Sequence, residues 1–70
     1  MINKEYEITI KNKFIHIKNY KNINNISESR IEISLNNKLL IINGSSLIIK
    51  CMDEYEIIII GVIKGLELNE

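Results

Sequence analysis

Isoleucine and other apolar residues recur at every second position over several short stretches of this chain, with polar residues between them. Successive side chains of a β-strand point to opposite faces of a sheet, so this spacing predicts strands with one buried face. The clearest stretches are 5–10, 14–18 and 30–35. Isoleucine is branched at Cβ and favours strands, and the sequence contains no alanine, the best helix former. The pattern therefore predicts an all-β protein.

Polar segments separate the apolar runs and predict where the chain turns. Residues 11–13 and the pair Asn36-Asn37 have the spacing of short hairpin turns, and we expect positive φ at the asparagine pair. Residues 43–46 are predicted to form another turn, with Gly44 at a position of positive φ. Residues 19–25 are predicted to be an irregular loop with room for one short strand. Gly61 interrupts the last apolar run and predicts a bulge or a close backbone approach within a strand.

From Leu39 onward the chain is apolar on both faces of its predicted strands. One parity, expected to face the core, contains Leu40, Ile42, Leu47, Ile49, Ile57 and Ile59, and the other contains Leu39, Ile41, Ile48, Ile58, Ile60 and Val62. A chain of 70 residues has little material left to cover a second apolar face. The sequence thus predicts one domain over 1–70, a small antiparallel β roll or sandwich of five to seven short strands.

Two arrangements could cover the second apolar face. The sheet could close into a barrel or roll that buries both sets of side chains, or another molecule could cover the exposed set. We favour the second arrangement and expect a homo-oligomer with contacts among Ile48, Ile58, Ile60 and Val62. In either arrangement Gly44 and Gly61 are expected to be structural.

Composition and charge argue against several functional classes. Nine basic and nine acidic residues give a formal net charge of zero, which does not favour nucleic-acid binding. The single cysteine cannot form an internal disulfide, so we expect a cytoplasmic protein. No apolar leader segment is apparent near the start, and the longest apolar run, 57–63, is shorter than the ~20 residues of a membrane-spanning helix.

No cluster of residues in the sequence points to catalysis, a metal or a cofactor. His16, the only histidine, is predicted to be an exposed surface residue. Cys51 is expected to behave as a small hydrophobe. The acidic residues Asp53, Glu54 and Glu56 are expected to form a solvated turn. We therefore predict a non-enzymatic protein with no catalytic residues, no metal and no cofactor.

A competing hypothesis comes from lysines interleaved with aromatic residues in the first third of the chain: Lys11, Lys13, Phe14, Lys18, Tyr20 and Lys21. Such a pattern suits a small oligomeric β-barrel that binds single-stranded nucleic acid. The same lysines could instead face anionic lipid. The balanced charge and the nearby Glu5, Glu7 and Glu28 argue against the nucleic-acid hypothesis.

Two glycine-containing blocks resemble a pattern of the YabP/YqfC family of sporulation proteins, Leu-x-Ile-x-Gly-x-x-Leu-x-Ile followed by Ile-x-Ile-x-Gly-x-Ile. Residues 40–49, with Gly44, match the first block, and residues 57–63, with Gly61, match the second. Residues 66–68 resemble the closing strand, and 15–20 with 27–33 resemble the opening strands, so the resemblance covers nearly the whole chain. Asn36-Asn37 stands where many relatives carry glycine.

The resemblance implies expression during endospore formation. It also implies action in the mother-cell compartment or at the forespore surface, and association with a membrane-bound sporulation partner. It implies no catalytic activity.

Overall fold

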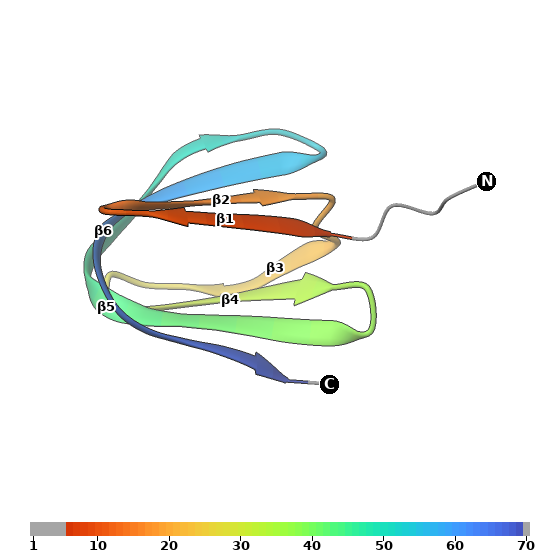
Figure 1. Cartoon of the computed structure of the whole chain (residues 1–70). Helices are drawn as coiled ribbons and strands as arrows, with labels where there is room; N and C mark the ends of the chain where they lie inside the picture. Colours follow the sequence, from red (N-terminus) through yellow and green to blue (C-terminus); the bar gives the residue numbers. More distant parts are fainter. Residues whose placement is uncertain (1–5, 70) are drawn as a thin grey trace.

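The computed structural model describes residues 6–69, which form one antiparallel sheet of six strands (Figure 1). The strands are β1 (Glu7–Lys11), β2 (Phe14–Lys18), β3 (Asn22–Ile26), β4 (Arg30–Leu35), β5 (Lys38–Met52) and β6 (Glu56–Asn69). Their order across the sheet is β1-β2-β6-β5-β4-β3. The predicted all-β antiparallel fold is confirmed, although β5 and β6 are far longer than the short strands expected.

The two long strands bend together and fold the sheet over on itself, at the left of Figure 1. The first layer contains β1, β2, residues 56–60 of β6 and residues 48–52 of β5. The second layer contains β3, β4, residues 38–43 of β5 and residues 65–69 of β6. Each short hairpin is thus added to one arm of the long β5–β6 hairpin, and the result is a small β roll.

The core lies between the two layers and is entirely aliphatic. Its buried members are Ile15, Ile17, Ile31, Ile33, Leu35, Leu40, Ile42, Leu47, Ile57 and Ile59. Ile49 and Ile63 are partly buried and pack against this cluster. The side chains expected to face the core in 14–18, in 30–35 and in the C-terminal half are therefore confirmed. Ile10 differs, because it lies on the edge strand β1 and is exposed.

The two layers are built in the same way. In the first, β2 pairs with β6 so that Ile15 lies opposite Ile59, and in the second, β4 pairs with β5 so that Ile31 lies opposite Ile42. Each bend contains a glycine whose N–H donates to the turn of the neighbouring short hairpin. Gly61 N donates to Lys13 O (3.3 Å) and Gly44 N donates to Ser29 O (3.0 Å). The two halves of the sheet therefore occupy equivalent positions around the core.

The prediction of a turn at residues 43–46 is wrong. These residues continue β5, and Asn43, Gly44 and Ser45 pair across the ladder with Gly65, Ile63 and Val62. Register shifts on both sides let the strand bend without ending. Gly44 also lacks the expected positive φ, which Gly61 has (134°). Gly44 is required by a close backbone approach, because a Cβ there would collide with the carbonyl oxygen of Val62.

Two other turn predictions agree more closely with the structure. The hairpin at Asn36-Asn37 forms, with positive φ at Asn37 (63°) and not at Asn36. The expected loop over residues 19–25 contains the short strand allowed for it, β3, which pairs with β4 through a bulge beside Asn24. The Asn24 side-chain oxygen accepts a hydrogen bond from the Ser34 hydroxyl (3.0 Å), which ties the bulge to β4. The first predicted strand begins at Glu7, and Glu5 lies outside the described residues.

Candidate interaction face

Apolar side chains gather on the outer surface of the first layer. Phe14, Ile60 and Ile48 lie opposite one another across β2, β6 and β5. Their sequence neighbours Ile15, Ile59 and Leu47 point into the core, so these three side chains point outward. Ile58 shares the outer surface of β6. Val62 faces outward past the bend, since its neighbour Ile63 packs against the core. We call Phe14, Ile48, Ile58, Ile60 and Val62 the outer apolar face.

The outer apolar face contains all four residues predicted as contacts, together with Phe14. Ile48 and Val62 are 57% and 52% exposed, and the other three are half-buried by their neighbours. The chain thus forms a roll that leaves part of its second apolar set in solvent, so it does not bury both apolar sets as the closed barrel or roll would. Sequence reasoning did not select Phe14, although its alternation with Ile15 and Ile17 places it on the outer surface.

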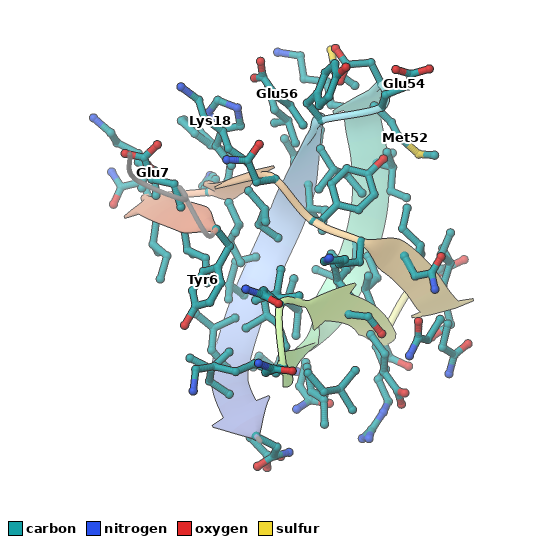
Figure 2. All side chains as sticks on the ribbon, turned by 90° about the vertical axis from the view of Figure 1, so that its right-hand side faces the viewer. Tyr6, Glu7, Lys18, Met52, Glu54 and Glu56 are labelled. Carbon is teal, nitrogen blue, oxygen red and sulfur yellow. The ribbon has the colours of Figure 1, made fainter. Side chains whose placement is uncertain are left out.

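One end of the outer apolar face is ringed by charged residues. Lys18 lies between Glu7 on β1 and Glu56 on β6, and Figure 2 shows Lys18, Glu56 and Glu54 at the same end of the molecule. His16 Nε2 lies 2.7 Å from Glu56 Oε1. The His16 side chain is 24% exposed, so the prediction of an exposed surface histidine is only partly right. It faces outward as expected, but it is partnered by a carboxylate on the neighbouring strand.

The turn between β5 and β6 closes this charged end. Asp53 Oδ1 accepts hydrogen bonds from the N–H groups of Tyr55 (2.8 Å) and Glu56 (2.9 Å). These bonds stabilise the ionised carboxylate and lower the pKa of Asp53 below its ordinary value. The Tyr20 hydroxyl donates to Asp53 O (2.5 Å), and Asn19 N donates to Tyr55 O (2.6 Å). The predicted solvated acidic turn is therefore present at Asp53 and Glu54, whereas Glu56 begins β6 and is partly buried. The turn anchors the connection from β2 to β3.

Only part of the lysine and aromatic set of the nucleic-acid hypothesis lies together. Lys11, Phe14 and Lys18 share the outer surface of the first layer, whereas Tyr20 does not. Phe14 lies on the outer apolar face with Lys11 opposite it on β1. Tyr20 packs against the core, and its hydroxyl is bonded to the turn at Asp53. Lys18 has acidic residues on both neighbouring strands. The arrangement does not combine a row of lysines with stacked aromatic rings.

The remaining chemically interesting side chains lie on the surface. Cys51, expected to behave as a small hydrophobe, is exposed opposite Ile58 because this segment of β5 is a sheet edge. Within residues 6–69, no three His, Cys, Asp or Glu side chains are grouped so that they could hold a metal ion. No helix able to cross a membrane occurs over the same residues.

The outer surface of the second layer is mostly polar by contrast, and its β5 positions include two apolar residues, Leu39 and Ile41. Arg30 Nε bonds Glu32 Oε2 (2.8 Å), and Glu32 and Glu67 flank Ile41 from the two neighbouring strands. Ile41 is only 6% exposed but does not belong to the core between the layers. The aliphatic parts of its charged neighbours can shield such a side chain. The two layers therefore differ sharply in the chemistry of their outer surfaces.

Comparison with known proteins adds no relative. No protein-family model, no curated protein and no solved structure matches this chain.

Proposed function

We propose that this chain is a non-enzymatic sporulation protein of the YabP/YqfC type that acts as a structural or assembly factor. It acts by self-association through its β-sheet or by binding a membrane-bound sporulation partner. The observation that carries the assembly role is the outer apolar face, where Ile48 and Val62 remain more than half exposed. Exposed apolar patches of this kind typically mark sites of protein association.

The family part of the proposal is supported by what the two glycines do in this fold. Gly44 and Gly61, the glycines of the two matching blocks, occupy the bends of β5 and β6. Both bends require glycine for steric reasons, so the spacing of the two blocks places a glycine at each bend of the long hairpin. A protein with the same two blocks would be able to build the same bent hairpin.

The proposed site of action is the mother-cell compartment, with the chain peripheral at the forespore membrane. The outer apolar face would contact the partner, while the polar second layer would face solvent. No cofactor or nucleic acid takes part in this role.

A test in a sporulating, endospore-forming bacterium examines this role directly. The tagged chain is expressed in sporulating and in vegetative cells, crosslinked and recovered, and the fluorescent fusion is imaged. We expect recovery of a sporulation membrane protein or of the chain itself, and signal at the forespore. The variant I58K/I60K should lose both, whereas E28K/E67K, which changes exposed residues in the β3–β4 turn and on β6, should keep both. Diffuse signal and equal recovery for the two variants would contradict the proposal.

A further inference from the structure

The equivalence of the two layers provides an internal comparison for the outer apolar face. Five outward positions of the first layer have counterparts at the same ladder positions of the second. The first layer carries Phe14, His16, Ile58, Ile60 and Ile48, and the second carries Arg30, Glu32, Ile41, Asn43 and Gly65 in the same order. The second layer folds with mostly polar residues or glycine at these positions. The fold itself therefore does not require apolar side chains on the outer surface of the first layer.

The rim of the outer apolar face carries opposite charge at its two ends. Near the bend, Lys11 lies opposite Phe14 and Lys13 lies in the adjoining turn. At the other end stand Glu7, Asp53, Glu54 and Glu56, with Lys18 among them. Lys11 lies four positions after Glu7 on β1, which corresponds to about 13 Å along a strand. This separation exceeds the ~8–10 Å screening length at moderate salt, so the two ends act independently.

A face with one basic end and one acidic end is complementary to a copy of itself turned around. We propose that two copies of this chain stack through their outer apolar faces, antiparallel about a two-fold axis, with Lys11 and Lys13 of each copy beside the acidic end of the other. Packed sheets lie about 10 Å apart, a distance that Lys and Glu side chains can bridge together. This inference rests on the proposed assembly role and names its partner as a second copy.

The area available sets the expected strength of this contact. Five partly exposed apolar side chains are fewer than the 20 to 30 residues that each partner contributes to a standard interface. The association must also offset the loss of translational and rotational freedom. We therefore expect a weak dimer whose population rises over the micromolar range, and whose stability depends on the charged rim. Added salt should weaken it.

The test uses two charge-reversed variants and their mixture. K11E/K13E makes both ends acidic, and E7K/E54K replaces two exposed acidic residues while leaving Asp53 and Glu56 with their hydrogen bonds. Each variant alone should dimerise about tenfold or more weakly than the wild type in sedimentation equilibrium. An equimolar mixture should recover dimers, because each reversed end then meets an end of opposite charge. E28K/E67K carries the same charge change as E7K/E54K away from the face and should dimerise as the wild type does.

Alkylation of Cys51 provides a second readout that does not depend on charge. The thiol is exposed in the single chain and pairs with Ile58 at the margin of the outer apolar face. Its reaction with a maleimide should slow as the wild-type concentration rises, and should stay fast in I58K/I60K. Circular dichroism of each variant establishes that it is folded.

The outcomes separate the inference from the proposed function. A dimer that is unaffected by the charge reversals, or a mixture that stays monomeric, overturns the antiparallel stacking but leaves the assembly role in place. A wild-type chain that remains monomeric up to millimolar concentration overturns self-association itself. Partner recovery from sporulating cells then decides the proposed function separately.

Discussion

The three glycines of this chain allow a sharp test of why the long hairpin can bend. A Cβ at Gly44 would fall inside contact distance of Val62 O, and the carbonyl would have to withdraw by on the order of 1 Å. A Cβ at Gly61 would lie 2.6 Å from Ser46 O, and the backbone there has a φ of 134° that other residues rarely adopt. A Cβ at Gly65 would meet no atom within 4 Å.

These differences predict a steep ranking of the three alanine variants. Gly44→Ala and Gly61→Ala should each lower the free energy of unfolding by about 3 kcal/mol or more, because the β5–β6 ladder must open to admit the methyl group. Gly65→Ala should leave it unchanged or raise it by about 0.4–1 kcal/mol, since alanine restricts the unfolded chain. A protein of 70 residues has a total of about 4–10 kcal/mol, so the first two variants should be largely unfolded or close to it. Valine at Gly44 or Gly61 should be worse than alanine.

The assay is urea denaturation followed by far-ultraviolet circular dichroism. Because association adds concentration-dependent stability, each variant is measured at two protein concentrations and the lower one is used for the comparison. Gly44→Ala within about 0.5 kcal/mol of the wild type, or Gly65→Ala as unstable as Gly44→Ala, would refute the steric explanation of the bend.

Three further predictions concern the core, the acidic turn and the β4–β5 hairpin. Ile59→Ala should cost about 2–5 kcal/mol of stability in the same denaturation assay, since the side chain is fully buried, whereas Ile48→Ala on the outer apolar face should cost much less in the single chain; equal losses would contradict the inward and outward assignment. The Asp53 pKa is lowered by folding, so its contribution to stability is present above about pH 4 and is lost as the pH falls through and below that value. As the pH falls below about 4, Asp53→Asn should therefore lose less stability than the wild type. If NMR shows the Asp53 carboxyl titrating at or above its ordinary pKa, the stabilising role of its hydrogen bonds would be contradicted. Asn37 has a φ of 63°, so Asn37→Ala should destabilise the hairpin by about 1 kcal/mol while Asn37→Gly should not, and similar melting temperatures for the two would exclude a left-handed turn.

Much of the fold could be predicted because period-two alternation reports directly on strands. Ile15 and Ile17, and likewise Ile31 and Ile33, alternate with polar residues, and all four are fully buried. The alternation of 57–60 was hidden by four consecutive isoleucines, yet parity counted along the strand still placed Ile57 and Ile59 inward. The Asn36-Asn37 turn was equally readable, since a two-residue gap between apolar runs is a local signal.

The turn predicted for 43–46 does not form, although the sequence of this segment is typical of a turn. Asn, Gly and Ser favour turns in isolation, but here Asn43, Gly44 and Ser45 have ladder partners on β6, and Gly44 also donates to the β3–β4 turn. Whether such a segment reverses the chain or bends a strand depends on the length of the neighbouring strand available for pairing. That length is a property of the whole hairpin and cannot be read from four residues.

The sequence by itself determined which side chains share a face, because side-chain direction in a strand follows position alone. Only the tertiary structure decided which faces meet. Phe14, Ile48 and Ile60 come from three separate segments and form one outer surface because β6 pairs with β2 on one side and β5 on the other. On the other layer, Arg30, Glu32 and Glu67 share the outer surface because β5 pairs with β4 on one side and β6 on the other. The strand order is the one that buries the core-facing side chains of both layers against each other. Such burial depends on segments far apart in the sequence, so no local sequence pattern can predict it.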